Sequence, residues 1–231
     1  MHRKSTINRF AMHKLLERLK RKFENLPFTS DVLKAELGDY SAQNAKIAAL
    51  VDDGYLLRLK KGMYCLAPSL IGGKVDVCNV ANWLYGPSYV SFETVLSMHA
   101  LIEDRTVEVI SAVNRRSKEY NTPIGRFSYR TVDDNWFPIG VESCKMGASY
   151  VLVASPEKAL ADLLVTRENL RIASVGALRS YLQNDLRFDL ESFVNPDVEI
   201  FHQLAQCGRK VPLVTALERC FLAQYLEQRI F

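Results

Sequence analysis

The segment 55–66 is the feature that most constrains the fold of this chain. Two short apolar runs, residues 55–59 and 63–66, flank the tripeptide Lys60-Lys61-Gly62. Short apolar runs on either side of a glycine-containing turn are typical of two antiparallel strands joined tightly. We therefore predict a β-hairpin over this segment.

Three helices are predicted before the hairpin. From residue 12 to residue 26, apolar residues recur at steps of three and four, which indicates an amphipathic helix with a basic opposite face. Thr29 or Ser30 is expected to cap a second, short helix, and Ser41 to cap a third that ends near Asp52. Short helices followed by a hairpin predict a winged helix-turn-helix module, in which the hairpin is the wing.

The charges of the chain are unevenly distributed. The whole chain has a net charge of +4, but residues 1–68 hold 13 Lys or Arg against 7 Asp or Glu, which gives +6 and leaves −2 for the remainder. A basic module of this kind predicts a polyanion as its partner. We accordingly divide the chain into a DNA-binding domain, 1–68, and a second domain, 74–231, on either side of a Pro-, Ser- and Gly-containing segment.

The candidate DNA-binding residues fall into two groups. The first group surrounds the start of the third helix, which we expect to enter the major groove, and consists of Tyr40, Ser41, Gln43, Asn44 and Lys46. The second group lies on the wing, where phosphate contacts are expected, and consists of Arg58, Lys60 and Lys61. The outward positions of the third helix include several alanines, which suit either close approach to DNA or packing against protein, so base reading by this helix stays open.

The second domain is predicted to be α+β. Residues 106–113 and 126–132 are interpreted as a hairpin around a polar loop, and residues 149–154 as a third strand. Earlier helices are expected at about 75–85 and at 92–101, the latter capped by Ser91. Later ones are expected from Ser155-Pro156 to about Val165 and at about 174–184, 189–206 and 211–228. Strands therefore precede helices within this domain.

No catalytic or metal-binding pattern is visible. The four histidines are isolated, the five cysteines form no C-x-x-C pair, and the sequence has no phosphate-binding loop and no nucleophile elbow. The neighbouring charged residues Asp133-Asp134 and Glu157-Lys158 are interpreted as a turn and a helix start. We expect neither a catalytic residue nor a cofactor nor a metal, and no membrane segment. The cysteine pattern favours a reducing cytoplasm.

Residues 40–68, YSAQNAKIAALVDDGYLLRLKKGMYCLAP, resemble the AbiEi-like antitoxins and transcriptional regulators of the type IV AbiE toxin-antitoxin systems. The similarity continues with VSFETVLSMHAL at 90–101 and SPEKALADLL at 155–164, in the family's order. It extends over about residues 28–165. In these motifs Glu93, His99 and Asp162 are the candidates for partner binding or another functional role, whereas their apolar neighbours are interpreted as core.

The resemblance implies a non-enzymatic protein with a DNA-binding head. Such a protein binds the operator of its own operon as a repressor, and its larger domain counters a nucleotidyltransferase-like toxin without a stable complex. Two alternatives remain open: a free-standing winged-helix regulator whose second domain senses a ligand or a protein, and a nucleic-acid-processing enzyme with a winged-helix targeting head. The sequence does not define the operator, the toxin or the oligomeric state.

Overall fold

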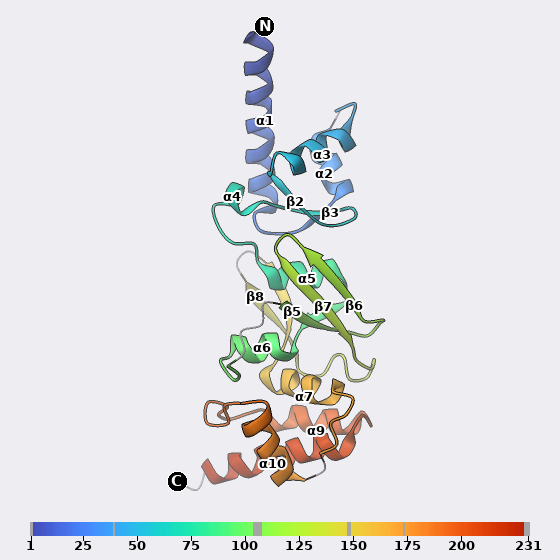
Figure 1. The fold of residues 1–231 in the computed structure, drawn as a ribbon, viewed down its shortest axis with the longest axis vertical. Coiled ribbons are helices and arrows are strands. Elements are labelled where there is room, and N and C mark those ends of the chain that lie inside the picture. Colours follow the sequence, from blue (N-terminus) through green and yellow to red (C-terminus); the bar gives the residue numbers. More distant parts are fainter. Residues whose placement is uncertain (1, 39, 104–107, 147–148, 173, 229–231) are drawn as a thin grey trace.

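The computed structural model describes residues 2–38, 40–103, 108–146, 149–172 and 174–228. Its helices, one three-stranded sheet and one six-stranded sheet make a mixed α+β protein, as the sequence predicts. Figure 1 shows an elongated molecule with the amino-terminal helix at one end and the last helices at the other. No helix in these ranges has the length and apolar character needed to cross a membrane.

The N-terminal unit, from α1 to β3, contains three helices and a small antiparallel sheet. The helices are α1 (His2–Phe23), α2 (Ser30–Leu37) and α3 (Gln43–Asp52), and the strands are β1 (Phe28–Thr29), β2 (Leu56–Lys60) and β3 (Met63–Leu66). The strand order is β1-β3-β2. Lys60 pairs with Met63 across the turn, and Gly62 has a φ of +77°, so the predicted glycine hairpin is confirmed.

The helix starts of this unit agree only in part with the sequence. Thr29 caps α2 as expected, because its Oγ1 accepts a hydrogen bond from Val32 N at 3.4 Å. The expected cap of α3 by Ser41 is wrong, since the N-cap residue is Ala42 and no side chain caps this end. The Gln43 side chain instead donates to the backbone carbonyl of Gly38 at 2.6 Å, which secures the turn that leads into α3.

The C-terminal unit, from α5 to α10, is built around the six-stranded sheet. Its strands are β4 (Ser88–Val90), β5 (Glu108–Val113), β6 (Lys118–Thr122), β7 (Gly125–Thr131), β8 (Val141–Met146) and β9 (Ser149–Ala154). They are arranged in the order β6-β7-β5-β4-β9-β8. The pairs β5–β7 and β4–β9 are parallel, and the others are antiparallel.

The predicted hairpin between 106–113 and 126–132 is therefore wrong. β5 and β7 pair in parallel, and the antiparallel partner of β7 is β6, which lies inside the expected loop. β6 is an edge strand with mostly polar, exposed side chains, so it lacks the apolar signal that marks a buried strand. Residues 106 and 107 lie outside the described residues.

The helices of the C-terminal unit are α5 (Val77–Leu84), α6 (Phe92–Met98), α7 (Pro156–Thr166), α8 (Val175–Ser180), α9 (Val198–Gln206) and α10 (Val211–Gln228), with a π-helical turn η1 (Tyr181–Asp185) after α8. The start of α7 is as predicted, with Ser155 Oγ accepting from Lys158 N at 3.2 Å. The helix expected at 189–206 is wrong in its first half, because Asp197 caps α9 and the helix begins only at Val198. Helices at the carboxyl end follow the strands, as expected.

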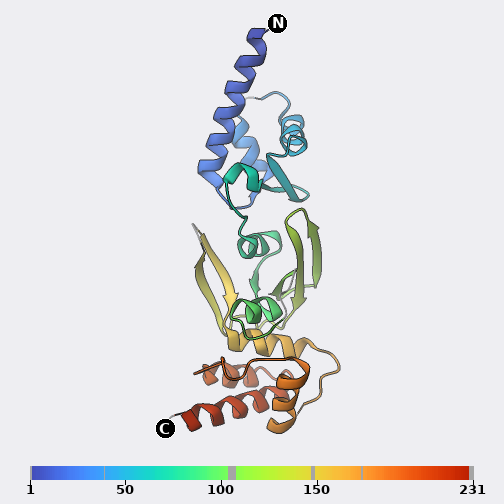
Figure 2. The same cartoon turned by 60° about the vertical axis from the view of Figure 1, so that its left-hand side comes forward.

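Two apolar cores meet at the hairpin β2–β3. Leu56 and Leu66 belong to the core of the N-terminal unit, whereas Leu59, Met63 and Cys65 belong to the core of the C-terminal unit. The segment that we expected to be the boundary contains the short helix α4 (Pro68–Ile71). Figure 2 shows this helix and the chain that follows it between the two units. The hairpin thus packs on both sides.

Candidate nucleic-acid interface

A groove runs between α3 and the β2–β3 hairpin in the N-terminal unit. It has a volume of about 410 Å³, and its polar lining includes Lys34, Asn44, Arg58 and Lys61, together with Asp52. Arg58 and Lys61 are exposed, and within the described residues neither forms an ion pair. The groove therefore gathers three cationic side chains beside a helix.

A second groove of about 360 Å³ lies around the start of α3. It is lined by Lys34, Tyr40, Ser41, Gln43 and Asn44, with two alanines. Lys34 and Asn44 line both grooves, so the two are adjacent. The structure thus brings six of the eight residues predicted from the sequence together along one surface: Tyr40, Ser41, Gln43, Asn44, Arg58 and Lys61.

The exposed side of α3 is flat. Asn44, Ala45 and Ala48 are exposed, while Ile47 and Leu50 are buried in the core. Alanine side chains permit another molecule to approach the helix backbone closely, and the Asn44 amide can both donate and accept hydrogen bonds. The helix can therefore make shape-dependent contacts along its length and one polar contact near its start.

Lys34 is the residue of this surface that the sequence analysis missed. It lies in the last turn of α2, where a lysine is ordinarily explained by its interaction with the helix dipole. Its place beside α3 and the hairpin depends on the packing of α2 against both, so no local sequence pattern identifies it.

Lys46 turns away from the groove. Its Nζ lies 5.8 Å from the centroid of the Tyr40 ring and 3.8 Å from Met12 Sδ, so it packs between Tyr40 and α1. It supports Tyr40 rather than lining either groove.

Lys60 does not lie at the hairpin tip with Arg58 and Lys61. Its Nζ donates to the carbonyl of Leu84 at 2.6 Å and lies 5.8 Å from the centroid of the Tyr120 ring, both in the C-terminal unit. The strand register shifts between Arg58 and Lys60, which directs the two side chains differently. Burial, and secondarily the charge of Lys118, lower the pKa of Lys60. Lys60 therefore belongs to the seam between the units.

The basic face of α1 is partly neutralised. Arg18 Nε lies 3.3 Å from Glu36 Oε2, and Lys22 also pairs with Glu36. Other residues of this face, His13, Lys20 and Arg21 among them, line a wide groove of about 1090 Å³ that also reaches Lys74. α1 thus has a solvated basic face, and two of its basic residues form ion pairs with α2.

The candidate residues of the C-terminal unit do not come together. Glu93 pairs with Arg130 at 3.1 Å. His99 is exposed at the C-cap of α6. Asp162 is fully buried within α7. The structure therefore gives these three residues separate surroundings.

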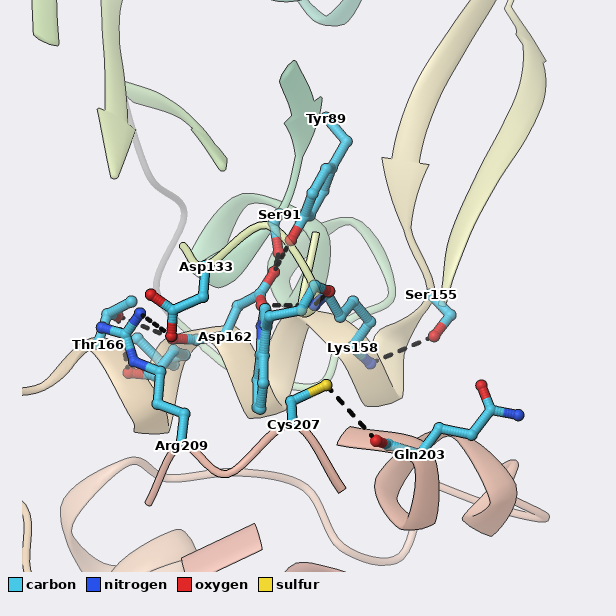
Figure 3. A network of polar contacts seen from close by, with 12 residues as sticks. Tyr89, Ser91, Asp133, Ser155, Lys158, Asp162, Thr166, Gln203, Cys207 and Arg209 are labelled. Carbon is cyan, nitrogen blue, oxygen red and sulfur yellow. Dashed lines mark hydrogen bonds and ion pairs between the residues drawn. The ribbon is translucent and has the colours of Figure 1, made fainter. Parts of the chain in front are cut away.

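Asp162 is the centre of a buried polar network (Figure 3). Its Oδ2 accepts from Tyr89 at 3.0 Å and from Ser91 at 2.6 Å, and its Oδ1 accepts from Trp136 Nε1 at 2.5 Å. Lys158, one helical turn earlier, places Nζ 3.2 Å from Oδ1. Ser91 occupies the N-cap position of α6, as expected, but its hydroxyl donates to Asp162 and makes no capping hydrogen bond to this helix.

The network is closed to solvent. Lys158 and Asp162 have 0% exposure, and Lys158 Nζ also donates to the Trp136 carbonyl at 2.7 Å. Burial raises the pKa of Tyr89. Burial lowers the pKa of Lys158, although the charge of the neighbouring Asp162 acts in the opposite direction. Both carboxylate oxygens of Asp162 are engaged, and the arrangement joins β4, α7 and the 132–137 turn.

Asp133 and Glu157, the first residues of the two charged pairs considered in the sequence, have structural partners. Asp133 pairs with Arg209 at 3.2 Å, and Glu157 accepts from the backbone nitrogen of Asp197 at 3.0 Å. In the ranges that the structure describes, no three His, Cys, Asp or Glu side chains are placed to hold a metal ion.

A comparison with models of known protein families gives no match, and a comparison with curated protein sequences gives none either.

Proposed function

We propose that this protein is a DNA-binding transcriptional regulator whose N-terminal unit is a winged helix-turn-helix domain. The order of α1, α2, α3 and the β2–β3 hairpin is the order of elements in such domains. In this proposal α3 is the recognition helix and the hairpin is the wing.

The groove between α3 and the hairpin is the observation that carries the proposal. A helix that enters the major groove has phosphates on both of its sides, so cations are needed beside the helix as well as on the wing. Lys34, Arg58 and Lys61 have these positions, with Asn44 at the start of α3, where base edges would be reached. Asn is suited to paired hydrogen bonds with adenine, and the exposed alanines are suited to contact with thymine methyl groups.

The resemblance to the AbiEi family extends the proposal to a biological role. On that basis the protein acts in the cytoplasm, represses its own operon, and counters a nucleotidyltransferase-like toxin through its C-terminal unit without a stable complex. The assignment of a separate task to the C-terminal unit is supported by its apolar core, which is distinct from that of the N-terminal unit.

The DNA-binding proposal is tested with duplexes from the region upstream of the gene. The full chain is titrated against a labelled upstream duplex and against a shuffled duplex of equal length at several salt concentrations. We expect tighter binding to the upstream duplex and a linear fall of the logarithm of the binding constant with the logarithm of salt concentration. Equal, weak binding to both duplexes contradicts a regulatory role.

The antitoxin role is tested by growth. A nucleotidyltransferase-like gene next to this one is expressed under control, alone and with the full chain, and soluble protein levels are checked. We expect co-expression to restore growth, also when Arg58 and Lys61 are both replaced by alanine, because neutralisation is assigned to the other unit. Absence of rescue by soluble protein, or an unrelated neighbouring operon, favours a free-standing regulator.

A further inference from the structure

A cluster of basic and aromatic side chains lies where the two units meet. Tyr85, which follows α5, and Tyr120 in β6 have ring centroids 6.2 Å apart. Lys118 Nζ lies 5.5 Å from the first ring centroid and 5.0 Å from the second. Arg115 lies 5.5 Å over the Tyr85 ring, and Lys60 lies 5.8 Å from the Tyr120 centroid. We call these five residues the seam cluster.

The cations of the seam cluster have no acidic partners. Within the described residues, Lys60, Arg115 and Lys118 form no ion pair with a carboxylate. Arg116, the next residue along the loop, is exposed and forms none either, and its carbonyl accepts from the Tyr85 hydroxyl at 3.0 Å. The loop that carries these arginines is thus tied to the cluster by its backbone.

The opposite face of the same strands is different. Arg126 in β7 lies 3.1 Å from Glu108 and 2.9 Å from Glu119, and Arg130 pairs with Glu93. Side chains alternate between the faces of a sheet, so the two faces of this hairpin differ in charge balance. On one face the arginines are paired with acids, whereas the seam-cluster cations on the other face form no ion pair within the described residues.

Neighbouring cations without acidic partners repel one another. Contacts with aromatic faces offset this repulsion only in part, by about 0.5–1 kcal/mol each at exposed sites. Burial lowers the pKa of Lys60, and the charge of the neighbouring Lys118 lowers it further. An anionic partner relieves this repulsion. The cluster is also held in place by rings and backbone, so little conformational freedom would be lost when it binds.

The position of the cluster indicates which anion. The β2–β3 hairpin contributes a cation to each place, because Lys61 lines the groove beside α3 and Lys60 reaches the Tyr120 ring of β6, which Lys118 also contacts. We propose that the seam cluster, with Arg116, contacts the phosphate backbone of the same DNA duplex that lies against α3. This inference rests on the proposed DNA-binding function, and it adds a DNA-contacting surface on the C-terminal unit.

The test compares two triple variants of the full chain that remove equal charge. The first is Arg115→Gln, Arg116→Gln and Lys118→Gln. The control is Lys145→Gln, Arg171→Gln and Arg179→Gln, at positions in β8, the 167–174 segment and α8. Thermal melting establishes that both are folded, and the single variant Lys118→Gln provides a second, milder substitution.

We expect the first variant to bind the upstream duplex more weakly and with a smaller salt dependence. Each lost phosphate contact lowers the slope by about 0.9, so the fall should approach three units for the triple variant and one for Lys118→Gln. The control should stay close to the wild type. Slopes equal to those of the control overturn this inference alone, provided that replacement of Arg58 and Lys61 still weakens binding. Failure of the wild type to bind duplex DNA overturns the proposed function as well.

Discussion

Lys158 and Asp162 form an ion pair that is completely buried, with Nζ 3.2 Å from Oδ1 and 0% exposure of both side chains. The pair stands one turn apart on α7, and its hydrogen bonds reach β4 and the turn that carries Trp136. It holds three segments that are distant in the sequence. This explains why two charged residues, Lys158 and Asp162, stand in the buried part of α7.

Removing one partner of this buried ion pair should lower the free energy of unfolding far more than removing one partner of an exposed ion pair. Lys158→Met leaves the Asp162 carboxylate buried without its cation, which is expected to lower the free energy of unfolding by about 3–5 kcal/mol. Arg126→Met, whose ion pairs are half exposed, is the control and should cost about 0–1 kcal/mol. Urea denaturation measures both values. Equal losses in the two variants would refute the structural role of the network.

The pH dependence of stability should reveal the burial of Cys65. Burial raises the pKa of this thiol from 9.0 to about 12. Above pH 9 the unfolded chain therefore releases the proton while the folded chain retains it, so stability falls as pH rises toward 12, by at most about 1.4 kcal/mol per pH unit from this group. Below pH 9 the contribution is fully present.

The matched variant for this prediction is Cys65→Ala, studied under reducing conditions. At pH 7 it should be less stable than the wild type, because it loses buried volume. The difference in unfolding free energy should narrow between pH 9 and pH 11. A difference that stays constant across this range contradicts the assignment.

The hairpin should link the two units energetically. Leu59 packs in the core of the C-terminal unit, whereas Leu33 packs in that of the N-terminal unit. In the full chain, Leu59→Ala and Leu33→Ala should each cost about 2–5 kcal/mol. In a fragment of residues 1–74, only Leu33→Ala should lower the free energy of unfolding substantially. The fragment lacks the partners of position 59 in the C-terminal unit, whether that position holds Leu or Ala. Chemical denaturation of the four variants and their two parent proteins measures this, and an equal effect of Leu59→Ala in the fragment is the contrary result.

Local signals of the sequence predict the N-terminal unit well. The hairpin follows from two apolar runs around Gly62, and the start of α2 follows from Thr29, because both depend on neighbours within a few residues. The start of α7 follows in the same way from Ser155 and Pro156. The sequence predicts these features because each of them depends on contacts within its own segment.

The wrong predictions concern residues whose structure depends on contacts with segments distant in the sequence. β6 is polar and exposed, so only its pairing with β7 makes it a strand. Ser91 has the residue type and position of a helix cap, yet the buried carboxylate of Asp162 takes its hydroxyl. The direction of Lys60 likewise depends on the shift in strand register and on the C-terminal unit. Tertiary contacts of this kind leave no periodic pattern.

The alanine face of α3 provides a test of its contact with DNA. Ala48 is exposed and lines the groove beside the hairpin. Ala48→Glu should leave stability within about 0.5 kcal/mol, as for most surface substitutions, yet weaken duplex binding at least tenfold through bulk and charge repulsion. Ala177→Glu, at an exposed position in α8, is the matched control. Unaltered affinity of Ala48→Glu would place α3 outside the interface.

The salt dependence of duplex binding tests the central proposal most directly. Arg58→Ala and Lys61→Ala are combined in the full chain and compared with the wild type and with the pair Lys145→Ala and Arg171→Ala, which removes the same charge outside the groove. With about 0.9 lost from the slope for each phosphate contact, the groove variant should lose nearly two units, and its affinity should fall on all duplexes alike. If its slope equals that of the control pair, the groove between α3 and the hairpin does not bind DNA.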